Sequence, residues 1–140
     1  MDAKVKCNNG TFVGKEADEL IVWKGIPYAT QPVGKLRWQK PLPAADDDGV
    51  YDAIEPGHVP IGPLNDSMGT AEFGEDCLVL NVYCNTACAD GKKPVMVWIH
   101  GGGFCAESQS SPLTTSPASP SSAPTSSSCP STTGSAFWGS

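Results

Sequence analysis

The sequence has few of the features that mark membrane, nucleic-acid-binding or secreted proteins. Its 140 residues contain no apolar run of about 18 residues, the length that a membrane-spanning helix needs. Nine Lys and Arg residues stand against fifteen Asp and Glu residues, and the net charge of −6 comes without a basic cluster that could bind nucleic acid. The first residues lead into no apolar segment of signal-peptide length. We therefore expect a cytoplasmic chain that binds neither nucleic acid nor membrane.

Histidine is scarce, and the six cysteines form no convincing metal motif. The two histidines, His58 and His100, have no ligand-like spacing to the one close cysteine pair, Cys84 and Cys88. A zinc site would need a second pair or a suitably placed histidine. We expect free thiols in a reducing compartment, and neither a metal nor a cofactor.

The composition changes abruptly after Glu107. Residues 108–140 carry no charge, and 23 of these 33 residues are Ser, Thr or Pro. Such a tract cannot bury enough apolar surface to offset the entropy lost on ordering, so we expect it to be disordered. The chain is therefore divided into a folded part, residues 1–107, and a disordered tail, residues 108–140.

The folded part has the pattern of short strands separated by Gly- and Pro-rich connections. Asn8-Asn9-Gly10 is a tight-turn sequence because Asn and Gly tolerate positive φ. Residues 94–99 are nearly all apolar, which is typical of a strand buried on both faces. Residues from Thr30 to about Thr70 are rich in Pro, Gly and Asp, and indicate surface connections. The expected strands are Lys4–Cys7, Thr11–Val13, Leu20–Trp23, Leu78–Tyr83 and Pro94–Ile99.

The last of these strands runs directly into a glycine-rich loop, His100-Gly101-Gly102-Gly103-Phe104. Glycine lacks Cβ, so its backbone can turn sharply and approach a ligand closely. Three in succession can aim N–H groups at one point, as a developing oxyanion requires. Loops of the HGGG type supply part of the oxyanion hole in lipases and esterases. A merely flexible loop is the alternative that three glycines alone leave open.

The order of several further segments helps to decide between an oxyanion loop and a merely flexible loop. They are Phe12–Gly14, Trp23–Ala29, Pro32–Trp38 with Pro41 and Pro43, Gly74–Tyr83, and Pro94–Phe104. In this order and spacing the chain resembles the type-B carboxylesterase family, which includes para-nitrobenzyl-esterase-like enzymes and the cholinesterases. The resemblance covers Cys7 to about Phe104, roughly three quarters of the chain.

The resemblance implies an α/β fold, the N-terminal portion of an α/β-hydrolase in which an antiparallel β start leads into the central sheet. The fold would be incomplete here, because a domain of this family is several times longer. Gly102 and Gly103 would donate the oxyanion-hole N–H groups, and His100, Gly101 and Phe104 would support the loop.

The resemblance also implies structural roles for the charges in the Gly74–Tyr83 segment. Glu75 and Asp76 would pair with a basic residue, for which Arg37 is the candidate. In some secreted relatives the cysteine at the Cys77 position is bonded to an upstream cysteine. This chain has no cysteine between Cys7 and Cys77, which agrees with a cytoplasmic form.

The family hydrolyses carboxylic esters with a serine nucleophile, a histidine base and an orienting acid, and it needs no cofactor. The serine lies in a G-x-S-x-G elbow, a pattern that occurs nowhere in these 140 residues. An oxyanion hole without an activated nucleophile stabilises no transition state. We therefore expect the chain as written to be an inactive part of an esterase whose partner would be a small-molecule ester. The sequence does not indicate an oligomeric state.

The tail departs from the family, in which a strand resembling VVVVSVNYRLGVLGF follows the HGGGF loop. Permitted codons for residues 125–140, read from the last base of the Pro124 codon, translate as DVVVVSVNYRLGVLGF. Only the first base of each shifted codon is free in this test, so such a match by chance is very improbable. Our hypothesis is that the tail is an out-of-frame translation, with the shift between about Cys105 and Pro124.

Two other functions stay open at this point. The chain could be a non-catalytic binding or adhesion member of the same fold, although such a module has no need of an oxyanion loop. It could also be a genuine short protein whose disordered tail mediates interactions, which would require that the tail is in frame.

Overall fold

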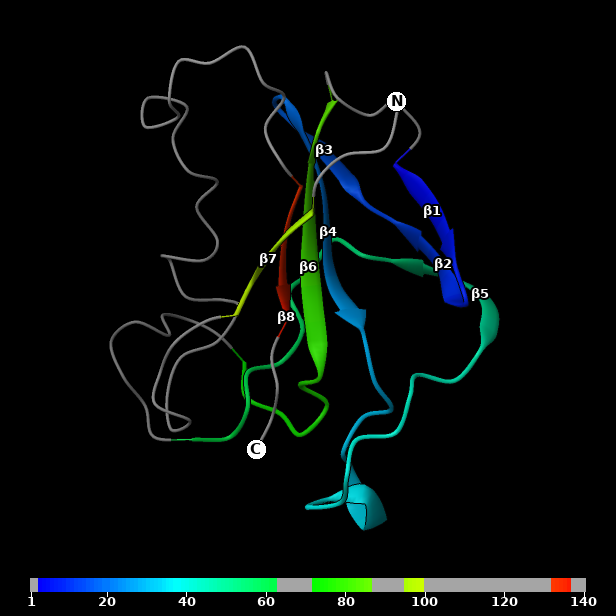
Figure 1. Cartoon of the computed structure of the whole chain (residues 1–140), viewed down its shortest axis with the longest axis vertical. Helices are drawn as coiled ribbons and strands as arrows, with labels where there is room; N and C mark the ends of the chain where they lie inside the picture. The colour runs from blue at the N-terminus through cyan, green and yellow to red at the C-terminus, as the bar shows by residue number, and fades with distance from the viewer. Residues whose placement is uncertain (1–2, 63–71, 87–94, 100–131, 137–140) are drawn as a thin grey trace.

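A computed structural model describes residues 3–62, 72–86, 95–99 and 132–136, which form two β-sheets (Figure 1). The strands are β1 Lys4–Cys7, β2 Asn9–Val13, β3 Lys15–Ala17, β4 Leu20–Pro27, β5 Asp47–Asp52, β6 Val79–Asn85, β7 Val95–Trp98 and β8 Thr132–Ala136. The first sheet has the order β1-β2-β5, and the second has the order β3-β4-β6-β8-β7. A short 3-10 turn, η1 Gly34–Leu36, lies in the connection between β4 and β5. The described residues form no α-helix, so the helical layers of the predicted α/β fold stay a prediction.

The hairpin expected around Asn8 is present. β1 and β2 pair antiparallel with Cys7 opposite Gly10, so the two residues between them make the turn. β5 lies on the other side of β2 and runs parallel to it, with Phe12 opposite Tyr51. The sequence did not predict β5, because a run of Asp and Gly residues has a low strand propensity. The predicted surface connection is therefore interrupted by a strand.

In the second sheet, β4 is longer than the predicted strand and contains a β-bulge. Two β4 residues, Lys24 and Gly25, lie opposite the single β6 residue Asn81. Gly25 has φ +66°, a left-handed conformation that glycine adopts without steric cost. Such an extra residue bends a strand and increases its twist, which lets β4 continue along β6 as far as Pro27.

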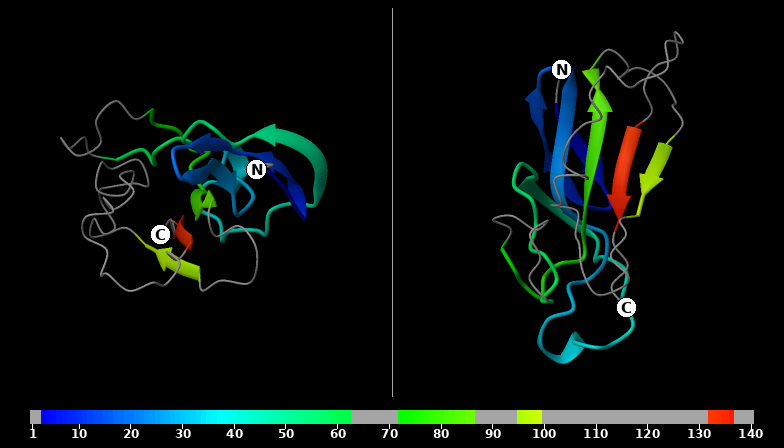
Figure 2. Two further views of the ribbon diagram at one scale, coloured as in Figure 1. Left: turned by 90° about the horizontal axis from the view of Figure 1, so that it is seen from above. Right: turned by 90° about the vertical axis from the view of Figure 1, so that its left-hand side faces the viewer.

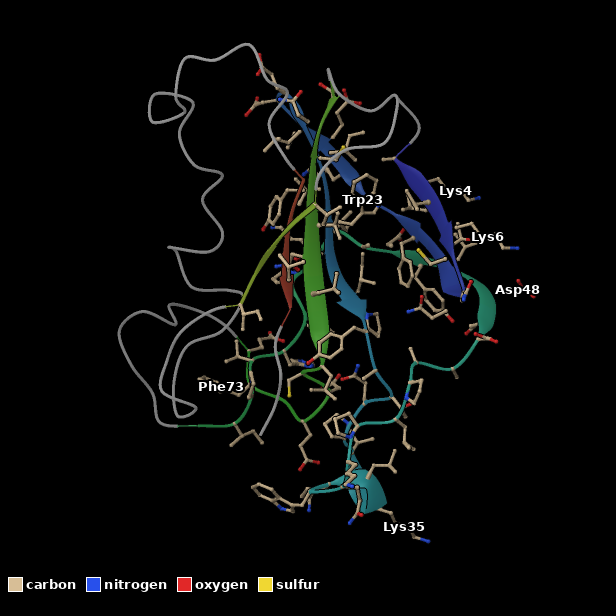
Figure 3. The ribbon with its side chains drawn as sticks, in the orientation of Figure 1. Lys4, Lys6, Trp23, Lys35, Asp48 and Phe73 are labelled. Atoms are coloured by element: carbon tan, nitrogen blue, oxygen red, sulfur yellow. The ribbon has the colours of Figure 1, made fainter. Side chains whose placement is uncertain are left out.

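The core lies between the two sheets. Phe12 of β2 packs with Ile21 and Trp23 of β4 and with Ala53, and none of these four side chains is more than 7% exposed. Trp23 also donates its indole N–H to the Ala3 carbonyl at 2.8 Å. In Figure 3, Trp23 lies between β4 and β1, whereas charged side chains such as Lys4 and Lys6 point away from the core.

The predicted strand at residues 94–99 is present as β7, but its burial differs from the prediction. β7 is the outermost strand of its sheet, and Val95, Val97 and Ile99 are 60–69% exposed. The prediction that both faces are buried is wrong for these three side chains. The physical reason is that no described element packs over this face.

Five residues of the predicted disordered tail lie in a strand. β8 runs between β6 and β7, antiparallel to β6 and parallel to β7 (Figure 2). Ladder hydrogen bonds join backbone groups, so a Thr- and Ser-rich sequence can occupy this position without apolar side chains. The prediction of disorder does not hold for residues 132–136, and the other tail residues lie outside the described part of the chain.

Candidate functional site

The predicted oxyanion loop lies outside the described residues. It consists of His100, Gly101, Gly102, Gly103 and Phe104. The structure describes the framework that leads to it, namely β7 and the Gly74–Tyr83 segment that enters β6. The roles of the five loop residues stay predictions.

Arg37 and Glu75 form the ion pair that the resemblance implied. Nε of Arg37 donates to Oε1 of Glu75, and Nη2 donates to Oε2 at 2.8 Å. Two parallel hydrogen bonds of this kind match the guanidinium to the carboxylate and fix their relative orientation. The hydrogen bond from Arg37 lowers the pKa of Glu75, and Glu75 in turn raises the pKa of Arg37. The pair therefore ties the connection after η1 to the segment before β6.

Asp76 has a different partner, His58, which the sequence did not predict. Nδ1 of His58 lies 2.7 Å from Oδ1 of Asp76, and Nε2 lies 3.7 Å from a carboxylate oxygen of Glu72. Backbone hydrogen bonds join the same two segments: Val59 N–H donates to the Glu72 carbonyl at 2.8 Å, and Gly74 N–H donates to the Val59 carbonyl at 3.0 Å. Because His58 and Asp76 are 18 residues apart, no local pattern connects them.

Gln31 holds the residue that precedes β6. Its Nε2 donates to the Leu78 carbonyl at 3.1 Å, and its Oε1 accepts from the Leu78 N–H at 3.0 Å. The Leu78 carbonyl also accepts from the Tyr28 N–H at 3.2 Å. One side-chain amide thus pairs both backbone groups of Leu78, as a neighbouring strand would.

Burial controls the chemistry of Cys77 and Tyr28 beside this contact. Cys77 is a free thiol only 8% exposed, and desolvation raises its pKa, as does the nearby Asp76 carboxylate. Desolvation also raises the pKa of Tyr28 to about 12. A thiol that stays protonated is a poor nucleophile, so Cys77 is a packing residue in this framework.

The contacts described above hold the segments of the framework together. Within residues 3–62, 72–86, 95–99 and 132–136, no group of three or more His, Cys, Asp or Glu side chains could hold a metal ion. In the same part of the chain, no helix has the length and apolar character to cross a membrane.

Residues 1–118 match the profile of the Carboxylesterase family. The chain belongs to this family. The match includes the Arg37–Glu75 pair and the predicted oxyanion loop, and the family resemblance seen in the sequence is confirmed.

Individual relatives of this chain agree with the family match. It is 42% identical over 105 residues to phenmedipham hydrolase of Pseudarthrobacter oxydans, which covers 68% of this chain and 20% of the relative. It is 41% identical over 108 residues to para-nitrobenzyl esterase of Bacillus subtilis (strain 168), covering 74% and 22% of the two chains. The chain thus spans about a fifth of the length of the curated relatives it matches.

Solved carboxylesterase structures share the arrangement of the described strands. A Geobacillus stearothermophilus carboxylesterase aligns with a TM-score of 0.77 at 34% identity, covering 97% of this chain and 26% of the other. A thermophilic para-nitrobenzyl esterase aligns with a TM-score of 0.75 at 35% identity, covering 82% and 24%. The α/β-hydrolase assignment is therefore confirmed for the region that aligns.

Proposed function

We propose that this chain forms the N-terminal part of a serine-dependent carboxylic ester hydrolase and carries its oxyanion-binding loop. The observation that carries the proposal is the family match, because residues 1–118 include the loop that ends at Phe104. In this mechanism the N–H groups of Gly102 and Gly103 donate to the oxygen of the tetrahedral intermediate and stabilise its negative charge. His100 and Gly101 shape the loop, and Phe104 supports it.

The serine nucleophile, the histidine base and the acid are not supplied by these 140 residues in this proposal, since no G-x-S-x-G elbow occurs among them. The 140-residue chain alone should therefore leave ester hydrolysis at its uncatalysed rate. Two relatives are named fumonisin B1 esterase and para-nitrobenzyl esterase, so the proposal commits to small carboxylic esters as a class. It requires no cofactor. The proposal keeps the expected cytoplasmic location.

A chimera tests the oxyanion loop. Residues 1–107 of this chain would replace the matching segment of the Bacillus subtilis para-nitrobenzyl esterase, and hydrolysis of a para-nitrobenzyl ester would be measured. We expect Gly103→Pro, which removes the N–H donor, to lower kcat about 10²- to 10³-fold. Gly103→Ala keeps the donor and is the matched control for added side-chain bulk. Equal activity of the proline and alanine variants, with equal melting temperatures, would remove the proposed donor role.

The reading frame of the tail is part of the same proposal. It rests on residues 125–140, whose shifted reading resembles the strand that follows the HGGGF loop in the family. Resequencing the DNA from the His100 codon through a few hundred codons should reveal a missing or extra base before Pro124. An open frame with G-x-S-x-G and a later histidine should follow it. A verified frame with stops in the shifted reading would instead favour the short protein with an interaction tail. A shifted frame without the catalytic serine would favour a non-catalytic binding protein.

A further inference from the structure

The Asn9–Gly10 dipeptide at the start of β2 consists of two residues that the fold holds for different reasons. The side-chain Nδ2 of Asn9 donates to the Pro27 carbonyl at 2.7 Å, across 18 positions of sequence. Gly10 has φ +133°, a conformation that a residue with a Cβ rarely adopts. A Cβ added at Gly10 would also lie 2.8 Å from Cε2 of Tyr51. Exchange of either residue would therefore cost a hydrogen bond or cause a clash.

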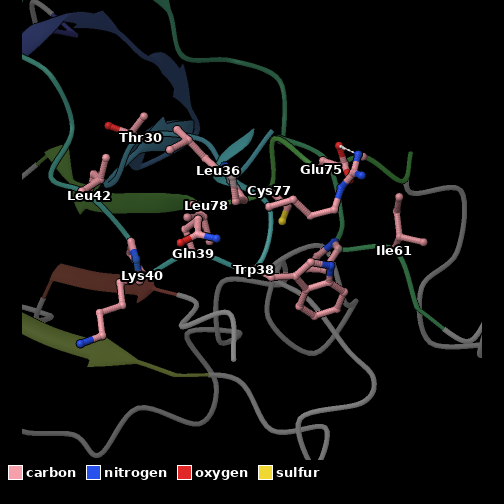
Figure 4. Close-up of a pocket in the computed structure, with 15 residues that line it drawn as sticks. Thr30, Leu36, Trp38, Gln39, Lys40, Leu42, Ile61, Glu75, Cys77 and Leu78 are labelled. Carbon is pink, nitrogen blue, oxygen red and sulfur yellow. Dashed lines mark hydrogen bonds and ion pairs between the residues drawn. The ribbon is translucent and has the colours of Figure 1, made fainter. Parts of the chain in front are cut away.

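The contact between Asn9 and Pro27 joins the two sheets. Asn9 begins β2 of the first sheet, and Pro27 ends β4 of the second. Beyond Pro27 the chain enters the connection that the Arg37–Glu75 pair ties to the segment before β6 (Figure 4). The Asn9 amide therefore fixes the point at which this connection leaves its sheet.

An Asn side chain that is followed by Gly can react with its own backbone. Once solvent hydroxide removes the proton of the Gly10 N–H, this nitrogen can attack Cγ of Asn9, because Gly has no Cβ to hinder the approach. A bond forms between the nitrogen and Cγ, the Cγ–Nδ2 bond breaks, and Nδ2 leaves as ammonia with a proton taken from water. Water then opens the succinimide ring at either carbonyl carbon. The products are aspartate and isoaspartate, and the net change is the exchange of ammonia for water.

We propose that Asn9 is a site of spontaneous deamidation, that its hydrogen bond to Pro27 restrains the reaction in the folded chain, and that the reaction uncouples the two sheets. The attack needs Cγ of Asn9 turned toward the Gly10 nitrogen, whereas the hydrogen bond holds the amide on the Pro27 carbonyl. The reaction therefore proceeds through a local opening that releases this bond. Water is the one co-reactant, and the inference is independent of the proposed esterase activity.

Both products remove the donor from which the Pro27 carbonyl accepts. An ionised aspartate has no side-chain donor, and its carboxylate would face another oxygen. Residue 9 is paired with Asp47 of β5, so the new negative charge would stand beside an existing one. Isoaspartate adds one carbon to the main chain and shifts the register of the residues that follow, among them Phe12, which is 3% exposed in the core.

Peptide mapping tests the site and its restraint. Cleavage after Lys6 and Lys15 isolates residues 7–15, in which Asn8 and Asn9 are the only side-chain amides. The full 140-residue chain and a synthetic peptide of residues 7–15 would be kept in the same mildly alkaline buffer and sampled by liquid chromatography with mass spectrometry. We expect aspartate and isoaspartate at position 9 in both, formed about tenfold more slowly in the full chain because the local opening must come first.

Two controls accompany this comparison. Urea should raise the rate in the full chain to that of the peptide, because it abolishes the contact with Pro27. Gly10→Ala in the peptide should slow the reaction, because a Cβ hinders the attacking nitrogen. A rate in the folded chain equal to or higher than that of the peptide would overturn the restraint. Conversion at Asn8 ahead of Asn9, or none at Asn9 in the peptide, would overturn the site.

Asn9→Asp reproduces one product and tests the uncoupling of the sheets. We expect it to lower the melting temperature of the full chain by roughly 4–8 °C, the effect of losing one hydrogen bond in a chain of this size. Asn8→Asp is the matched control, because it adds the same charge one position earlier on an exposed residue. Asn9→Ala removes the donor without adding a charge, so its melting temperature should lie between those of the two aspartate variants. An equal loss with Asn8→Asp, or no loss with Asn9→Ala, would overturn the uncoupling.

Discussion

The side-chain Oδ1 of Asn81 accepts a hydrogen bond from the backbone N–H of Gly25 at 3.0 Å, across 56 positions of sequence. Gly25 lies in the β-bulge of β4, where the ladder with β6 leaves its N–H without a strand partner. Asn81 is 1% exposed and lies opposite the bulge. A buried N–H that is left unpaired costs about 1–3 kcal/mol, so this side chain stabilises the irregularity that lets β4 and β6 stay paired.

Asn81→Ala should therefore lower the free energy of unfolding by about 1–3 kcal/mol, because it leaves the Gly25 N–H in the interior without a hydrogen-bond partner. Urea unfolding followed by circular dichroism measures the change. Asn8→Ala is the matched control, since Asn8 is exposed in the turn between β1 and β2. Equal effects of the two substitutions would contradict the role given to Asn81.

Gly25 and Gly34 both have a left-handed φ, but they differ in the space available for a Cβ. Alanine substitutions should therefore separate the strain of the left-handed φ from the steric clash of the Cβ. Gly25 has φ +66°, and an added Cβ would lie 2.8 Å from the Glu55 carbonyl oxygen. Gly34 has φ +56°, with nothing within 4 Å of an added Cβ. Gly34→Ala should lower the free energy of unfolding by about 1–2 kcal/mol, because a residue with a Cβ is strained in the left-handed conformation. Gly25→Ala should lower it by clearly more, because the added Cβ would also clash. Melting curves that rank Gly34→Ala as the more damaging change would refute this.

The Arg37–Glu75 pair should give the chain a specific dependence on acid. The hydrogen bond from Arg37 lowers the pKa of Glu75 from 4.5, so its stabilising contribution is present above pH 4.5 and is lost as the pH falls through the lowered pKa. The unfolding midpoint in urea, measured between pH 7 and pH 3, should fall less steeply in Glu75→Gln than in the unaltered chain. Arg37→Gln removes the same pair and should give the same flattened profile, with no further change in the double variant. An unaltered slope in both single variants would count against the pair.

All three tyrosines should resist ionisation in the folded chain. Burial raises the pKa of Tyr28 to about 12 and raises that of Tyr83, and the hydrogen bond to Asp47 raises the pKa of Tyr51. At pH 10, absorbance at the phenolate band should therefore show well under half of the tyrosines ionised, and urea should restore the ordinary titration. Because the folded pKa values are raised, stability should be complete below pH 10 and decline between pH 10 and about pH 12. Tyr51→Phe should reduce the absorbance change that urea releases, because one of the three phenols is then absent.

Local chemistry made part of this architecture predictable from the sequence. The Asn8 turn and the apolar runs of β4, β6 and β7 are short-range features, since turn residues and strand propensity act over a few positions. The Arg37–Glu75 pair was accessible only through the family resemblance, because the two residues are 38 positions apart. The sequence did not reveal the strand β5 because it is rich in Asp. In the folded chain β5 pairs with β2, with Tyr51 opposite Phe12, and Ala53, the residue after β5, packs in the core with Phe12.

What the sequence alone determined is the family, the main strand segments and the change in composition after Glu107. The tertiary structure decided the partner of Asp76, the bulge at Gly25, the exposure of the β7 edge and the position of β8 between β6 and β7. The physical reason is the range of the interactions. Turns and strand propensities depend on neighbouring residues, whereas the order of strands brings together groups that are distant in sequence, and their hydrogen bonds and burial depend on that order.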